Sequence, residues 1–103
     1  MIKAEFFEKD GEITGFRVND HADYAESGED IVCAAVSSAV QLTANLLDAL
    51  DLQPDINLGE NVVECMLPST GNLQAKILGQ FRLHLESVQE EFPENIKITI
   101  SEV

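Results

Sequence analysis

The feature that most constrains the fold is an apolar stretch at residues 31–50, which has the length of a membrane span. Polar residues interrupt it at spacings of four, four and three, at Ser37, Gln41, Asn45 and Asp48. This spacing places the polar side chains on one face of a helix, which is typical of a helix in a soluble protein. We therefore predict such a helix here, with Asp30 as its N-cap and its end near Asp51.

The apolar residues of this helix fall roughly on one face. The predicted lining residues are Val32, Val36, Val40, Leu47 and Leu50. Leu42 and Leu46 widen the apolar arc beyond that face. We therefore expect the helix to be either deeply buried or part of an interface.

The segments around this helix predict four strands and a second helix. Alternation predicts strands at residues 2–8, 13–19, 61–67 and 96–100, with Asp10-Gly11 as a hairpin turn between the first two. Apolar residues at helical spacing predict the second helix, from the turn at residues 68–72 to about Glu91. The predicted order is β-β-α-β-α-β, an α+β fold in which a single mixed, mostly antiparallel sheet packs with two helices. A length of 103 residues fits one domain over residues 1–103.

Composition narrows the class of protein. The chain has 6 Lys and Arg against 19 Asp and Glu, a formal charge of −13, and 45% hydrophobic residues. That apolar fraction is too high for a disordered acidic tail. The charge argues against direct nucleic-acid binding and favours a basic partner, or solubility alone. Two cysteines are too few for a disulfide scaffold, and we expect neither a signal peptide nor a membrane partner, so a cytoplasmic location is predicted.

A pairing of Cys33 with His21 is the strongest candidate for chemistry. If Asp30 is the N-cap, Cys33 is the third helical residue, where unpaired N–H groups and the helix dipole lower a thiol pKa. His21 precedes it across a glycine-containing loop and could form a thiolate–imidazolium pair, as nucleophilic catalysis requires. Carboxylates in this segment raise the pKa of both the thiol and the imidazole. The residues alone therefore do not decide whether Cys33 is a thiolate. A buried apolar cysteine and a surface histidine are the alternative.

The residues around this pair match a known family. The run from Asp30 to Ser37, preceded by His21-Ala22-Asp23 and Gly28, resembles the ribosomal-processing cysteine protease family (Prp). The resemblance extends through Pro54–Asn57 and Glu90–Ile96, nearly the whole chain. It implies a cysteine endopeptidase with Cys33 as nucleophile and His21 as base. It also implies removal of the N-terminal extension of large-subunit ribosomal protein number twenty-seven by a homodimer with a mobile loop, here residues 22–29. The family usually has Gly where this chain has Asp20.

Three further residues are candidates for a supporting role. Asp30 is predicted mainly as the helix N-cap, and a role in orienting His21 is the less favoured alternative. Gly28 and the first-turn amides are candidate donors to the oxyanion that forms during peptide hydrolysis. Ser37 lies one helical turn after Cys33, where it either supports the site or permits close packing. Phe16 and Tyr24 are candidate contacts in an apolar substrate groove.

The other cysteine and histidine carry weaker signals. Cys65 lies in a strand pattern and is predicted to be a packing thiol. His84 is predicted to be a partly exposed structural residue. The spacings match no zinc motif, so we predict neither a metal site nor a cofactor.

Two other functions compete with the protease. A non-catalytic acidic module could hold a basic ribosomal protein during ribosome assembly. A redox sensor using Cys33 would need a resolving thiol nearby.

Overall fold

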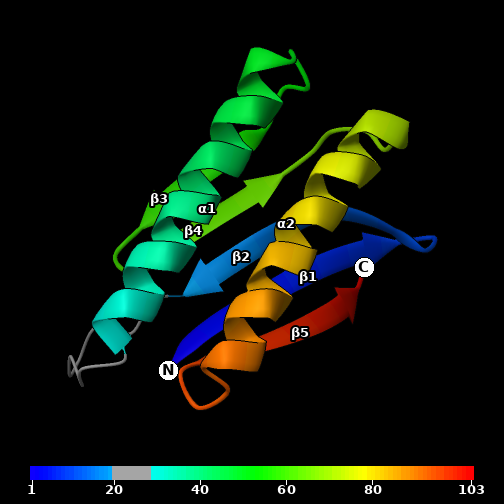
Figure 1. The fold of residues 1–103 in the computed structure, drawn as a ribbon. Coiled ribbons are helices and arrows are strands. Elements are labelled where there is room, and N and C mark those ends of the chain that lie inside the picture. Colours follow the sequence, from blue (N-terminus) through cyan, green and yellow to red (C-terminus); the bar gives the residue numbers. More distant parts are fainter. Residues whose placement is uncertain (20–28) are drawn as a thin grey trace.

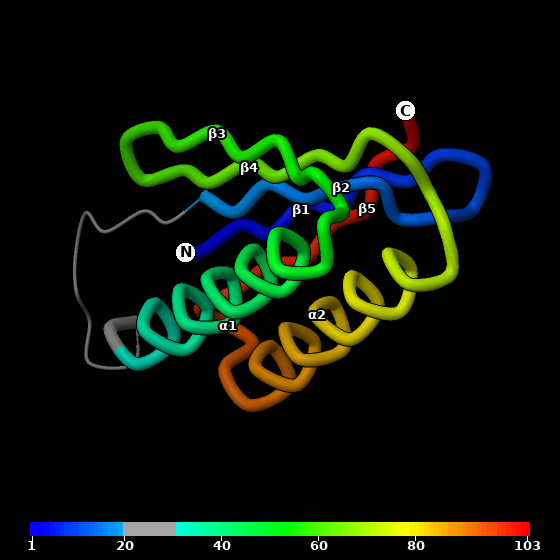
Figure 2. The backbone as a smooth tube through the Cα atoms, turned by 90° about the horizontal axis from the view of Figure 1, so that it is seen from above, coloured from blue at the N-terminus to red at the C-terminus, as the bar shows by residue number. Residues whose placement is uncertain are grey.

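The computed structural model describes residues 1–19 and 29–103 as a five-stranded sheet with two helices on one face (Figure 1). The elements are β1 (Ile2–Lys9), β2 (Glu12–Asn19), α1 (Glu29–Ala49), β3 (Asp55–Gly59), β4 (Val62–Met66), α2 (Asn72–Glu91) and β5 (Ile96–Glu102). The strands lie in the order β3-β4-β2-β1-β5. Seen from above, α1 lies nearer the β3 edge and α2 nearer the β5 edge (Figure 2).

The predicted fold class is confirmed. The sheet is mixed and mostly antiparallel, because only β1 and β5 pair in parallel within the described sheet. The predicted hairpin turn is also confirmed. Asp10 and Gly11 have φ of 54° and 82°, and the flanking Lys9 and Glu12 pair directly, as in a two-residue turn with left-handed central residues.

One strand was not predicted. The order is β-β-α-β-β-α-β, because β3 precedes the strand expected after residue 60. All five residues of β3 are exposed, and Asp55, Asn57 and Gly59 have low strand propensity. Its strand structure comes from antiparallel pairing with β4 at the edge of the sheet, which local pattern does not reveal.

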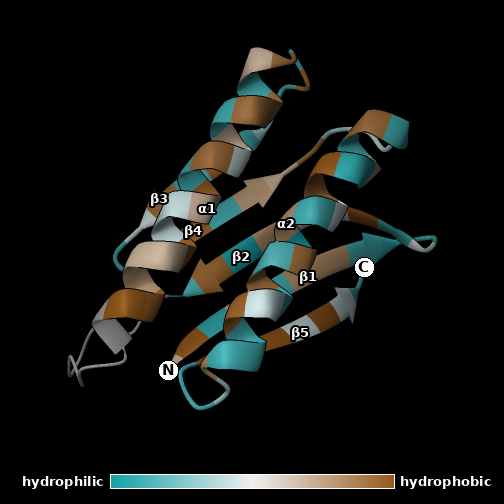
Figure 3. Cartoon of the chain, in the orientation of Figure 1, coloured by the Kyte–Doolittle hydropathy of each residue, from teal (hydrophilic) through white to brown (hydrophobic). Residues whose placement is uncertain are grey.

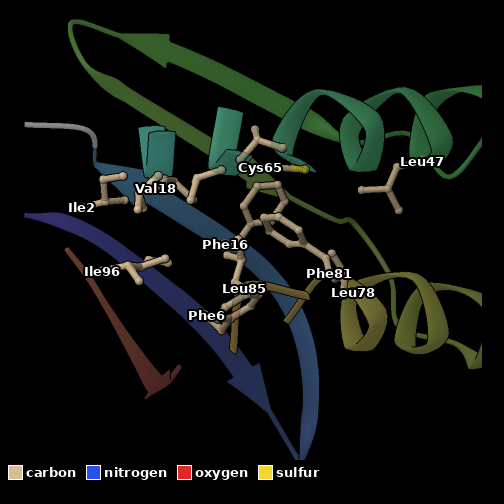
Figure 4. Packing of buried hydrophobic residues seen from close by; sticks show 14 of the residues in the cluster. Ile2, Phe6, Phe16, Val18, Leu47, Cys65, Leu78, Phe81, Leu85 and Ile96 are labelled. Carbon is tan, nitrogen blue, oxygen red and sulfur yellow. The ribbon is translucent and has the colours of Figure 1, made fainter. Parts of the chain in front are cut away.

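Alternate strand residues build the core beneath the helices. Ile2, Ala4 and Phe6 of β1 are buried on the face that the alternation predicts. Phe6, Phe16 and Phe81 form an aromatic cluster, with ring centroids 4.7 Å apart for Phe16 and Phe81 (Figure 4). Because Phe16 is fully buried, its predicted role as a substrate contact is wrong.

Helix α1 packs through the predicted valine face. Val32, Val36, Val40 and Leu47 are buried. Leu50 was predicted to join them, but it lies beyond the end of α1 and is 45% exposed. By length and composition alone, residues 31–49 could cross a membrane. Hydrophobic residues indeed recur along the whole helix (Figure 3), but one row of them is used to cover the sheet.

The opposite face of the sheet carries ion pairs. The Arg17 guanidinium lies 3.1 Å from a Glu5 carboxylate oxygen and 3.9 Å from one of Glu64. The Ser101 hydroxyl donates to Glu5 at 2.6 Å, which ties β5 to β1. These groups leave the outer face polar and the helix-covered face apolar.

The contact between β2 and β4 gives a stability prediction. A Cβ at Gly15 would lie 2.5 Å from the carbonyl oxygen of Cys65 and 2.6 Å from the sulfur of Met66. We expect Gly15→Ala to lower the free energy of unfolding by about 1–3 kcal/mol through overpacking. Gly79→Ala in α2 is the matched control, because its Cβ meets nothing within 4 Å, and we expect a gain of roughly 0.5–1 kcal/mol. Equal effects of the two substitutions in urea denaturation would show that β2 and β4 do not require glycine at position 15.

Candidate active site

An apolar cavity of about 330 Å³ lies between α1 and the β3–β4 hairpin. It is lined by Ile2, Val18, Cys33, Val36, Ser37, Val40, Gln41, Leu58, Gly59, Asn61, Val62 and Val63. Helix α1 supplies one wall and the hairpin supplies the other. The cavity therefore depends on both α1 and the β3–β4 hairpin.

Cys33 lies on the helix wall of this cavity. Its side chain is partly exposed and packs against the edge of the core. Helix α1 begins at Glu29, so Asp30 lies inside the first turn rather than at the predicted cap, and Cys33 is the fifth helical residue instead of the third. The Cβ of a helical residue tilts toward the helix N-terminus, so the Cys33 side chain leans toward the first turn, whose N–H groups have no partner within the helix.

The structure brings some predicted site residues together. Ser37 follows Cys33 by one helical turn and lines the same cavity. His21, Gly28, Asp20 and Tyr24 lie outside the described residues, as does the predicted mobile loop up to residue 28. Val18, near the end of β2, and Cys33, near the start of α1, line one cavity, so both chain segments that flank residues 20–28 reach the candidate site.

Part of the cavity wall was not predicted from the sequence. Leu58 and Asn61 belong to the hairpin that contains the unpredicted strand β3. Asn61 occupies the turn with a φ of 58°, a conformation that Asn tolerates better than most residues. Gln41 was recognised only as part of a polar stripe. Its spacing of eight residues from Cys33 was the signal that placed it on the same wall.

Cys65 has the environment of an inert thiol. It is fully buried beside Phe16 in the aromatic core (Figure 4). Burial, and then the nearby Asp55 carboxylate, raise the pKa of the Cys65 thiol to about 11. The prediction of a packing thiol is confirmed. A fully buried Cys65 is also a poor resolving thiol, which weakens the interpretation of Cys33 as a redox sensor.

A second cavity, of about 740 Å³, is lined by residues of α1 and α2. Leu42 and Leu46 line it and are 62% and 41% exposed. This side of α1 is therefore the apolar face that the sequence analysis expected to be either buried or part of an interface. His84 also lines it and is exposed. Within residues 1–19 and 29–103, no three His, Cys, Asp or Glu side chains converge to hold a metal ion.

Comparison with solved structures defines the class of protein. The chain matches Staphylococcus aureus ribosomal processing protease Prp in complex with a substrate peptide, with a TM-score of 0.91 and 29% identity, covering 98% of this chain and 100% of that one. It also matches that protease with a covalently linked product peptide, with a TM-score of 0.87 and 30% identity over 98% and 100% of the two chains. Both of these solved structures are of a cysteine protease, which is the class of protein that the comparison indicates for this fold.

Sequence comparison identifies the family. The family model described as "Cysteine protease Prp" matches residues 1–97. The ribosomal processing cysteine protease Prp of Staphylococcus aureus is 34% identical over 93 residues, covering 86% of this chain and 88% of the relative. The chain belongs to the Prp family of ribosomal-processing cysteine proteases. Family membership makes it an enzyme, so the non-catalytic acidic module is not supported.

The two thiols are predicted to differ in reactivity. Because the thiolate is the nucleophile, a buried thiol with a pKa of about 11 reacts slowly at neutral pH. We expect iodoacetamide to modify Cys33 first and to reach Cys65 only above pH 10 or after unfolding in urea. Mass spectrometry of the digested protein measures both rates. Equal rates of modification of Cys33 and Cys65 in the folded protein would contradict the prediction that Cys33 is the more reactive thiol.

Proposed function

We propose that the protein removes the N-terminal extension of large-subunit ribosomal protein number twenty-seven, with Cys33 as nucleophile and His21 as general base. The observation that carries this proposal is the position of Cys33 on the wall of the cavity, while Cys65 is buried in the core. A relative with a covalently linked product peptide supports covalent catalysis. The names of the relatives support a ribosomal protein as the substrate.

Chain connectivity supports the role of His21. It follows Val18, which lines the cavity, by three residues. Residues 20–28, which include His21, join β2 to α1, the two elements that bring Val18 and Cys33 to this cavity. His21 is one of only two histidines in the chain, and His84 lines the other cavity.

The proposed reaction has two stages. His21 takes the proton of the Cys33 thiol, and the thiolate attacks the scissile carbonyl carbon to give a tetrahedral oxyanion. The carbon–nitrogen bond then breaks, His21 protonates the leaving amine, and a thioester remains on Cys33. A water molecule gives its proton to His21 and attacks the thioester, which releases the acid product and restores the thiol.

Other predicted residues support this reaction. The amides of the first turn of α1, which have no partner within the helix, are together with Gly28 the proposed donors to the oxyanion. Asp30 lies in that first turn and is proposed to orient His21. Ser37 lies on the cavity wall and is proposed to support the site.

The charge of the chain supports a basic partner. A net charge of −13 attracts a basic ribosomal protein by long-range electrostatics. We expect the apparent affinity for substrate to fall as salt rises, because exposed charges are screened beyond about 8 Å at physiological ionic strength. The rate at saturation should change little. Steady-state kinetics at several salt concentrations tests this, and a salt-independent KM would contradict it.

The exposed apolar face of α1 supports a homodimer. Leu42 and Leu46 line the α1–α2 cavity, and a second copy of the chain would cover them. This face is separate from the cavity that holds Cys33, so dimerisation would leave the candidate site open.

A protease of newly made ribosomal proteins is proposed to act in the cytoplasm.

Mutation of each cysteine tests the nucleophile. We expect Cys33→Ala to abolish cleavage of the extended ribosomal protein, because the attacking sulfur is lost. Cys65→Ala should retain most activity while it lowers stability, since it opens a space in the core. Mass measurement of the product identifies the bond that is cleaved. Wild-type activity in Cys33→Ala would refute the mechanism.

A further inference from the structure

We propose that Gln41 positions the substrate by binding its main chain three to four residues from the scissile bond. The inference rests on the proposed function of Cys33 as nucleophile. Its starting point is a polar row on α1, formed by Cys33, Ser37 and Gln41, which all line the same cavity.

The spacing of this row matches an extended peptide. Residues four apart in a helix are separated by about 6 Å along its axis. Two residues of an extended strand advance by about 6.6 Å, and alternate residues present their main chain in the same direction. An extended substrate lying along α1 therefore brings equivalent main-chain groups to Cys33, Ser37 and Gln41 in turn. Gln41 lies about 12 Å from Cys33 along the axis, the length of three to four substrate residues.

The chemistry of the two cavity surfaces fits this arrangement. A glutamine amide offers both donors and an acceptor, which match the C=O and N–H of a peptide. Val36 and Val40 lie on the neighbouring row of α1, and Leu58 and Val63 line the hairpin side. Alternate substrate side chains can enter this apolar space while the main chain faces the polar row.

Gln41 has no structural role that would explain its position. Its side chain is exposed and makes no hydrogen bond to the residues that the structure describes. Thr43, two residues later, differs, because its hydroxyl donates to the Ala39 carbonyl at 2.7 Å. Asn45, the next member of the polar stripe, does not line the cavity. The row that can contact the substrate therefore ends at Gln41.

Peptides of increasing length test the proposal. Two series are built around the cleaved bond, lengthened one residue at a time on the acyl side or on the leaving side. With the wild-type protein, we expect kcat/KM to rise in one series when the third or fourth residue is added. Gln41→Ala should remove that gain, a loss of roughly three- to tenfold for one hydrogen bond, and should leave shorter peptides unaffected.

A matched variant separates positioning from folding. Gln89→Ala makes the same substitution on α2, at a residue that lines neither of these cavities, and should leave both series unchanged. An equal loss for short and long peptides in Gln41→Ala, or no loss, would overturn the proposal while leaving the nucleophile intact. Failure of the wild-type protein to cleave any peptide would refute the proposed substrate, and the role of Gln41 with it.

Discussion

The packing of Val32, Val36 and Val40 onto the sheet fixes the rotation of α1, and the rest of the structure depends on it. Successive residues of a helix are rotated by about 100°, so this choice also sets the direction of each neighbouring row. The row that starts at Cys33 then faces the β3–β4 hairpin, while Leu42 and Leu46 face α2. One buried valine face thereby sets the cavity wall that carries Cys33 on one side of the helix and an exposed apolar wall on the other.

Periodic segments were predictable, because burial on one face leaves a repeating pattern in the residues. β1 and α2 show this pattern clearly, and both occur where it predicts. β3 has no such pattern, since an exposed edge strand takes its structure from its partner. A bulge opposite Phe7 and Glu8 adds Thr14 to β2, so that Phe16 pairs with Phe6 and both rings lie in the core. Local sequence does not show such a shift of register.

The candidate site was predictable only in part, because a local pattern in the sequence reveals a helix face but does not reveal strand pairing. The motif around Cys33 pointed to the helix wall, because a helix converts spacing in the sequence directly into position. Leu58 and Asn61 reach the cavity through the β3–β4 hairpin and through the pairing of β4 with β2, and the second pairing is a contact between distant parts of the chain. Half of the cavity therefore depends on tertiary structure that no local motif encodes.

The acidic surface lowers the stability of the folded state. This cost favours a functional explanation for the large negative charge. The negative end of a helix dipole is stabilised by basic residues, yet neither helix has one in its last turn, and α2 ends with Glu90 and Glu91. A net charge of −13 adds self-repulsion to the folded state. Solubility alone needs far less charge than this in so small a domain. A basic partner would offset this repulsion when it binds, which is consistent with the proposed capture of a basic ribosomal protein.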